Sequence, residues 1–253
     1  MTVTVASFNI RKAIGTDRKR RPERILDVLA EIDPHVVALQ EADKRVGTRA
    51  AAVPHGLIDS HGAFDAVDFD VSHPKLLDRV PDHPVTRGFI ERLDTRNLGW
   101  HGNAILVKRG TRILDKVALD LPTFEPRGAV MAELEFGDGR QLRVIGMHLD
   151  LSGLWRKRQA RRILAHVEAR HAHMPTVLMG DTNEWRDGGC LTEFGERFAA
   201  VSCGPSFHSR KPIAHLDRIL VDRHVEIAEA GVHASDSARK ASDHLPVWAR
   251  LKL

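Results

Sequence analysis

The stretch "PTVLMGDTNEW", residues 175–185, decides the fold class, because a short apolar run ends abruptly in polar residues. Residues 176–180 have the length and the β-branched content of a buried strand. Asp181, Asn183 and Glu184 follow this strand at once. Such a cluster must face water, bind a cation or carry out chemistry, and the other strands help to decide which.

The same pattern of a buried strand followed by a polar residue occurs three more times. The runs are "VTVASF" at 3–8 before Asn9, "VVALQ" at 36–40 before Glu41, and "LRVIGM" at 142–147 before His148. In open α/β sheets ligands bind outside the carboxyl ends of the strands. The four runs therefore predict one shared site.

Two further polar clusters stand at the beginning of strands rather than at their ends. Asp217 precedes "RILV", and Asp243 and His244 precede "LPVWARL". If these strands run antiparallel to the first four, their starts lie at the same edge as the site. This requirement predicts mixed sheets rather than a purely parallel one.

The remaining patterns complete an α/β chain. Amphipathic helices are predicted over residues about 20–32 and 154–172, and the turn signal at 137–139 predicts a hairpin. Residues 43–99 lack sustained periodicity and predict a long loop. Because repeats and linkers are absent, we expect residues 1–253 to form a single domain.

Composition narrows the class of protein. The chain is 42% apolar and 28% charged, as in soluble globular proteins, and no stretch of about 18 apolar residues predicts a transmembrane segment. The N-terminus lacks a signal-peptide pattern, and Cys190 and Cys203 form no CxxC pair, so we expect reduced thiols and a cytoplasmic protein. The net charge of +4 suits an anionic substrate such as a phosphoester.

The polar residues at the strand ends are rich in hard oxygen donors. Carboxylate and amide oxygens suit Mg²⁺ or Mn²⁺ and disfavour structural zinc. The residues are Asn9, Glu41, Asp181, Asn183 and Asp243. Each alone is more often a turn or cap residue. The residue pattern therefore leaves both a hydrolytic metal site and coincidence open.

Seven motifs occur in a fixed order along nearly the whole chain. They are "SFNIR" at 7–11, "LQE" at 39–41, "GNAILV" at 102–107, "MHLD" at 147–150, "GDTN" at 180–183, "LDRILV" at 216–221 and "SDHLPV" at 242–247. This set resembles the endonuclease/exonuclease/phosphatase superfamily of DNase I-like nucleases, AP endonucleases, inositol polyphosphate 5-phosphatases and neutral sphingomyelinases. The segments "EPRGAV" and "RKRQARRIL" resemble those of its small bacterial members.

The resemblance implies a four-layer α/β sandwich, in which two packed mixed β-sheets are flanked by helices. It also implies a phosphoester hydrolase that depends on Mg²⁺ or Mn²⁺ and acts as a phosphodiesterase, nuclease or phosphatase. Glu41 would be the main metal ligand, with Asn9 and Asp243 close to it. Asp181, helped by Asn183, would position and deprotonate the attacking water.

The resemblance implies further roles at the phosphate. His244, paired with Asp217, would contact the scissile phosphate as acid, base or charge stabiliser. His148 would donate to a phosphate oxygen, and Asn103 and Arg127 would help to hold the substrate. The chain departs from the family in having Thr182 in place of the usual aromatic of "GDFN". Glu184 is expected to be only a loop residue.

The class of phosphoester stays open between nucleic acid, phospholipid and small phosphate ester. His148 stands where AP endonucleases carry tyrosine, and the chain has no tyrosine, which argues against abasic-site repair. Basic residues at 17–21 and in the 156–162 helix are candidates for DNA contact, and are equally readable as solvated helix faces.

Apolar residues near the motifs also allow two interpretations. Leu151, Leu154 and Trp155 form either an exposed lip for a lipid phosphodiesterase or the start of a buried helix. Trp185 and Trp100 either stack on a base or sugar, or pack in the core. A catalytically silent module that binds nucleic acid or lipid head groups is the alternative to an enzyme, and the complete motif set argues against it. No obligate protein partner is evident.

Overall fold

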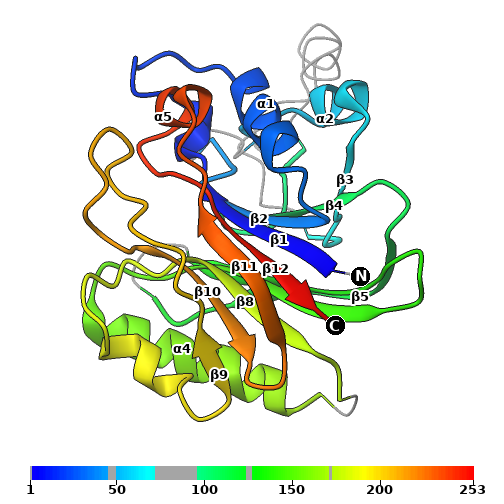
Figure 1. Ribbon diagram of the computed structural model, residues 1–253, viewed down its shortest axis with the longest axis vertical. Coiled ribbons are helices and arrows are strands. Elements are labelled where there is room, and N and C mark those ends of the chain that lie inside the picture. The colour runs from blue at the N-terminus through cyan, green and yellow to red at the C-terminus, as the bar shows by residue number, and fades with distance from the viewer. Residues whose placement is uncertain (1, 45–49, 72–95, 124–126, 171–172) are drawn as a thin grey trace, which may run out of the picture.

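The computed structural model describes residues 2–44, 50–71, 96–123, 127–170 and 173–253. Two six-stranded sheets pack face to face, and helices cover their outer sides (Figure 1). The predicted four-layer α/β sandwich is confirmed. None of the described helices has the length and apolar character needed to cross a membrane.

The first sheet has the strand order β11-β12-β1-β2-β4-β3. Its strands are β1 (Thr2–Asn9), β2 (Val36–Gln40), β3 (Phe64–Ala66), β4 (Ala104–Lys108), β11 (Glu226–Val232) and β12 (Val247–Lys252). β1 runs parallel to β2 and antiparallel to β12. The sheet is therefore mixed, as the position of the polar clusters predicts.

The second sheet has the strand order β5-β6-β7-β8-β10-β9. Its strands are β5 (Arg112–Asp120), β6 (Gly128–Glu135), β7 (Gln141–His148), β8 (Thr176–Asp181), β9 (Phe198–Ala200) and β10 (Asp217–Asp222). β7 and β8 are parallel, whereas β10 is antiparallel to β8. The start of β10 thus lies beside the end of β8.

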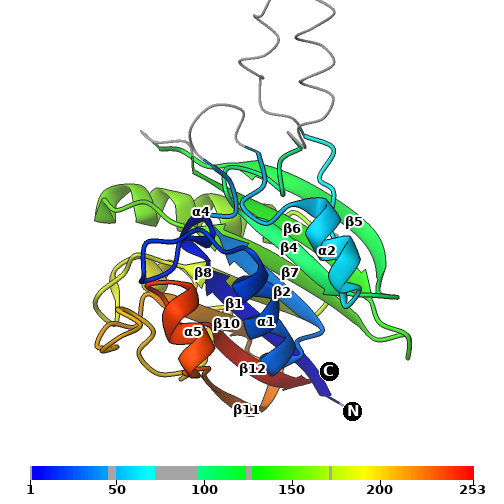
Figure 2. The same ribbon diagram turned by 90° about the horizontal axis from the view of Figure 1, so that it is seen from above.

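Burial of the central strands on both faces explains their continuous apolar runs. In β2, Val36 and Ala38 belong to the core between the two sheets, and Val37 and Leu39 belong to the core beneath the helices. The first sheet is covered by α1 (Glu23–Ile32), α2 (His55–His61) and α5 (Asp236–Ala241), and the second by α4 (Gly153–Glu168) (Figure 2). Two short 3-10 helices, η1 (Arg11–Ala13) and η3 (Gly189–Glu193), complete the described elements.

Two predicted helix boundaries are wrong. α1 begins at Glu23 rather than near residue 20, because Pro22 takes the N-cap position and Arg20 forms a bridge with Ile14. α4 ends at Glu168, and residues 171–172 lie outside the described structure.

The segment 43–99 is not simply a loop, since it contains α2 and β3. β3 completes the edge of the first sheet by pairing with β4, so its structure depends on a partner distant in sequence. Residues 45–49 and 72–95 lie outside the described structure.

Candidate active site

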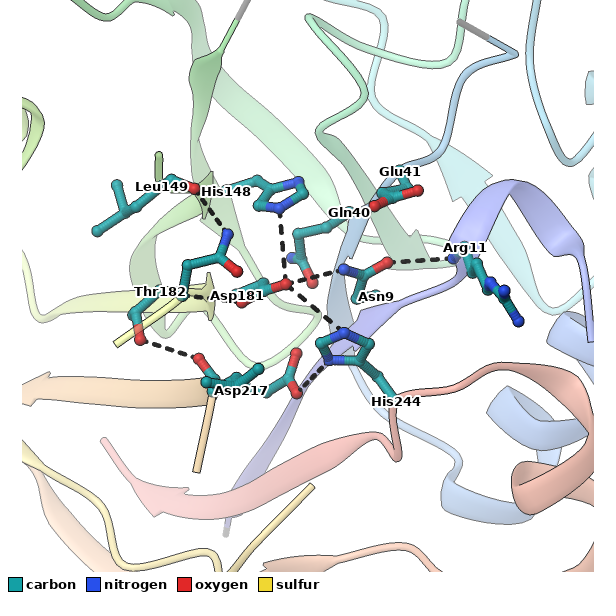
Figure 3. A network of polar contacts seen from close by, with 12 residues as sticks. Asn9, Arg11, Gln40, Glu41, His148, Leu149, Asp181, Thr182, Asp217 and His244 are labelled. Atoms are coloured by element: carbon teal, nitrogen blue, oxygen red, sulfur yellow. Dashed lines mark hydrogen bonds and ion pairs between the residues drawn. The ribbon is translucent and has the colours of Figure 1, made fainter. Parts of the chain in front are cut away.

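Three of the predicted residues lie side by side at one edge of the second sheet. His148 ends β7 and is the register partner of Asp181 at the end of β8, and Asp217 at the start of β10 is the antiparallel partner of Asp181. All three are at most 3% exposed. The mixed sheet therefore gathers these side chains as the sequence predicts (Figure 3).

The first sheet contributes residues to the same site from the opposite side. Asn9 ends β1, Glu41 follows β2 directly, and His244 precedes β12. Asn9 reaches across the sheets, and its Nδ2 donates a hydrogen bond of 2.9 Å to Asp181 Oδ2. The site thus lies at the junction of the two sheets (Figure 3).

Asp181 is a buried carboxylate with partners from both sheets. Its Oδ2 lies 3.5 Å from His148 Nε2 and 3.8 Å from His244 Nε2, and its Oδ1 accepts a hydrogen bond of 2.9 Å from the backbone N–H of Asn183. Burial, reinforced by the neighbouring Asp217 carboxylate, raises the pKa of Asp181 to about 6. A carboxyl with such a pKa can exchange a proton near neutral pH.

His244 and Asp217 form the predicted carboxylate–imidazole pair. His244 Nδ1 lies 2.8 Å from Asp217 Oδ2. Burial alone would lower the pKa of His244, but the Asp217 carboxylate beside the ring, together with Asp181, raises this pKa to about 10. The imidazole is therefore held as a cation that faces Asp181.

Ser206 supports this pair, and the sequence did not single it out. Its hydroxyl donates to the same Oδ2 of Asp217 that contacts His244, and Ser206 is completely buried. A serine in "CGPSFH" carries no motif, so only the tertiary contact reveals its place in the site.

The loop after β8 is fastened at two successive residues. Asn183 has a left-handed backbone with φ of 49°, and its Nδ2 donates a hydrogen bond of 2.9 Å to the carbonyl of Leu149. Thr182, which replaces the family's usual aromatic, is buried, and its hydroxyl donates to the carbonyl of Leu216 at 2.9 Å. The polar replacement is thus satisfied by a backbone acceptor.

Glu184 lies in the loop after β8, as expected, and it also has a structural contact that the sequence did not reveal. Glu184 is buried and forms an ion pair of 3.1 Å with Arg156, a residue of α4 that is itself buried. A Cβ added at Gly189 would meet Glu184 Oε2 at 2.1 Å, so this turn requires glycine. The buried ion pair therefore ties the loop that carries Asp181 to α4.

The predicted metal ligands Glu41 and Asp243 each lie beside a cation. Lys12 Nζ is 3.0 Å from Glu41 Oε2, and Arg11 Nε is 3.2 Å from Asp243 Oδ2. Arg11, Lys12 and the next residue all have positive φ, so a left-handed turn after β1 brings both cations to these carboxylates. Asn9 Oδ1 accepts a hydrogen bond from the backbone N–H of Arg11.

Two groups of side chains fit a divalent cation by the chemistry of their atoms. Glu41, Asp243 and Asn9 offer hard oxygen ligands, and the two carboxylate side chains are about one-fifth exposed, at 20% and 21%. Within the described residues, Asp181, Asp217 and His244 also offer ligand atoms that lie within 4.8 Å of one another.

Asn103 and Arg127, the other predicted substrate contacts, are buried. Asn103 Nδ2 donates to the carbonyl of Gly128 at 2.8 Å, and its Oδ1 has no hydrogen-bond partner among the described residues. Their contact with substrate stays a prediction.

Two of the apolar residues predicted as a lip or a buried helix start, Leu151 and Leu154, are exposed, and Trp155 is half-buried. Leu151 is 69% and Leu154 is 60% exposed, and the guanidinium of Arg158 lies 4.8 Å from the ring centroid of Trp155. By contrast, Trp100 is engaged on the protein itself, since its Nε1 donates to Asp120 Oδ1 at 3.0 Å. An apolar lip thus exists at the start of α4.

A two-sheet sandwich with a buried Asp–Asp–His group defines the DNase I-like class of phosphoester hydrolase folds. The chain belongs to the endonuclease/exonuclease/phosphatase family, whose model matches residues 6–244. The resemblance carried by the seven motifs is therefore confirmed. No curated protein matches the chain.

Several solved structures share this fold. TDP2 from D. rerio, complexed with a single-strand DNA product, is 17% identical with a TM-score of 0.71, over 100% of this chain and 99% of that chain. A mannosyl-6-phosphatase from Bacteroides thetaiotaomicron is 18% identical with a TM-score of 0.75, over 99% of this chain and 100% of that chain.

An endonuclease/exonuclease/phosphatase from Beutenbergia cavernae is 22% identical with a TM-score of 0.69, over 100% of this chain and 72% of that chain. At these identities the likeness shows the fold alone.

Proposed function

We propose that the protein is a divalent-metal-dependent phosphoester hydrolase, acting as a phosphodiesterase, nuclease or phosphatase. One observation carries the proposal: the buried Asp181 carboxylate lies between two imidazoles, and its pKa is raised to about 6. A general base with such a pKa is largely ionised at pH 7 and still takes up a proton readily.

In this mechanism Asp181 orients a water molecule and accepts its proton as the water oxygen attacks phosphorus. Asn9 and Asn183 bind the two carboxylate oxygens and so fix their direction. His244, with its pKa raised to about 10, remains protonated at neutral pH and stabilises the negative charge that grows on the phosphate. Its proton is also available to the leaving oxygen.

Mg²⁺ or Mn²⁺ would be held by Glu41, Asp243 and Asn9, whose oxygens suit these ions. The bound ion supplies charge neutralisation at the phosphoryl group and lowers the pKa of bound water. For the ion to bind there, Lys12 must move away from Glu41 and Arg11 must move away from Asp243.

The candidate substrates are phosphoesters of two kinds, nucleic acids and phosphate monoesters. The same fold occurs in TDP2 with a single-strand DNA product and in a mannosyl-6-phosphatase, so both nucleic acids and phosphate monoesters belong in a test. His148, 3.5 Å from Asp181, would donate to a phosphate oxygen, and Asn103 and Arg127 would position the substrate.

The test is hydrolysis of a panel of phosphoesters with Mg²⁺, Mn²⁺ or EDTA. The panel holds bis-(p-nitrophenyl) phosphate, plasmid DNA, abasic-site duplex, single-stranded RNA, phosphoinositides and cardiolipin. Asp181→Asn should abolish metal-dependent turnover, whereas Asp187→Asn, a control in the same loop with a side chain 95% exposed, should keep it. Equal turnover by both variants would refute the proposal. Tight binding of DNA or vesicles without turnover would indicate a silent binding module.

A lipid phosphodiesterase is the second candidate, because the lip of Leu151 and Leu154 is exposed beside the exposed basic residues of α4. Apolar side chains next to cations favour an anionic lipid surface. The double variant Leu151→Ser with Leu154→Ser should then lose hydrolysis of cardiolipin in vesicles and keep hydrolysis of a soluble diester. If the double variant hydrolyses both cardiolipin and the soluble diester at the wild-type rates, the lipid function is excluded.

A further inference from the structure

An aromatic contact leads outward from the proposed catalytic residue His244. The ring of Phe207 lies 4.8 Å from the ring of His244, measured between centroids, and 6.2 Å from the ring of Trp185. Trp185 and Phe207 meet edge to face, with an interplanar angle of 85°. The three rings connect the buried imidazole to an indole that is 61% exposed.

The rings of Phe207 and Trp185 are both carried by anchored backbone segments. Phe207 forms a β-bridge with His244, and the preceding Ser206 accepts a backbone hydrogen bond of 2.9 Å from Leu245. Trp185 directly follows Glu184, whose buried ion pair with Arg156 fixes the loop. The exposed indole is therefore presented by an anchored backbone, so stacking on it costs little conformational entropy.

The size of this surface favours a ring over an alkyl chain. Trp185 is followed by Arg186 and Asp187, both exposed, so the apolar surface ends with the indole along this loop. An acyl chain requires a continuous apolar trough, whereas a planar ring requires one open aromatic face. Stacking on an aromatic side chain is sequence-tolerant because every base has a π-face.

We propose that Trp185, supported by Phe207, forms a subsite that stacks a planar ring of the substrate, of nucleobase size, next to the reacting phosphate. This inference rests on the proposed phosphoester hydrolase function. Trp185 is then a specificity-determining residue. It selects phosphoesters whose alcohol part carries a planar aromatic ring over phosphoesters of sugars without such a ring.

The test uses two pairs of substrates in which only the base differs. One pair is adenosine 5′-monophosphate and ribose 5-phosphate. The other is a single-stranded oligonucleotide and the same oligonucleotide with tetrahydrofuran in place of its bases. The kcat/KM ratio of the base-bearing to the base-free member is measured with Mg²⁺ or Mn²⁺ for the wild-type protein and each variant.

Trp185→Ala should lower this ratio about tenfold, chiefly through KM, because a stack formed in both ground and transition states contributes uniform binding. Trp185→Phe should keep most of the ratio. Ile113→Ala removes an exposed apolar side chain of β5 that lies outside the aromatic contact, and it should leave the ratio at the wild-type value.

Three results would overturn the inference. They are an equal loss of kcat/KM on both members of a pair, a ratio that falls as far in Ile113→Ala, and a wild-type protein that hydrolyses other phosphoesters but neither base-bearing substrate. In each case the hydrolase function stands. Absence of turnover on every phosphoester would instead remove the proposed function itself.

Discussion

The candidate site contains two groups of carboxylates that differ in their burial and in the side chains beside them. Asp181 and Asp217 are buried between the sheets, and their neighbours are imidazoles, an amide and a hydroxyl. Glu41 and Asp243 are about one-fifth exposed and contact the cationic ends of Lys12 and Arg11. Burial raises the pKa of Asp181 in the first group, whereas each carboxylate of the second group already contacts a cation that a metal ion could replace.

The largest effect is expected from the buried group. Asp181→Asn keeps the shape of the side chain and removes the base, so kcat should fall by about 10²–10⁴ at saturating metal. Because the folded pKa is raised to about 6, the ionised carboxylate costs free energy at pH 8. The thermal midpoint of Asp181→Asn at pH 8 should therefore equal or exceed that of the wild type. If Asp181→Asn has a lower thermal midpoint than the wild type at pH 8, or if extra metal restores its activity, the buried and the half-buried carboxylates do not differ in the way described.

The exposed group should behave differently. Glu41→Gln removes a charged ligand, so the metal concentration for half-maximal rate should rise by at least about tenfold, with activity recovered at high metal. Metal titration by calorimetry measures the same change without turnover. An unchanged titration, with activity lost at every metal concentration, would place Glu41 with the buried group instead.

The dependence of the rate on pH follows from the two raised pKa values. The rate should rise with pH through about 6 as Asp181 ionises, and fall through about 10 as His244 loses its proton. The paired imidazolium stabilises the fold fully below the ordinary pKa of 6.5, and this contribution is lost as pH rises through about 10. Asp217→Asn removes the carboxylate that opposes the effect of burial, so the alkaline limb should move to lower pH. A kcat/KM profile with an unmoved alkaline limb would contradict this pairing.

The smallest effect is expected at Lys12. Lys12→Gln removes a cation that lies 3.0 Å from the Glu41 carboxylate, so the metal should bind several-fold more tightly. Arg24→Gln, which breaks an exposed ion pair with Asp17, is the matched control and should leave metal affinity unchanged. Weaker metal binding in Lys12→Gln would mean that the ammonium helps to assemble the site.

The sequence was most informative where the pattern within a single strand predicts both its burial and the polar residue that ends it. β1, β2, β7 and β8 are buried on both faces, so their apolar runs and the polar residues that end them were visible along the chain. Mixed sheets were predicted because the starts of β10 and β12 reach the edge of the site only if these strands run antiparallel to the others. This reasoning brought Asp217 and His244 into the site together.

Contacts between distant segments were not visible in this way. The role of Glu184 was missed because its partner Arg156 comes 28 residues earlier, and ion pairs leave no periodicity. α2 and β3 were missed because the short strand β3 depends on pairing with β4. In each case the determining partner is set by packing rather than by neighbours in the chain.

The sequence by itself determined the mixed α/β character, through its local apolar patterns, and the family with its two-sheet sandwich, through its ordered motifs. Only the tertiary structure decided how the residues of the site differ from one another. It buried Asp181 between two imidazoles, set Ser206 against Asp217, and left the indole of Trp185 exposed beside Phe207. The physical reason is that desolvation and distance determine pKa values and stacking, and both arise only when the two sheets pack together.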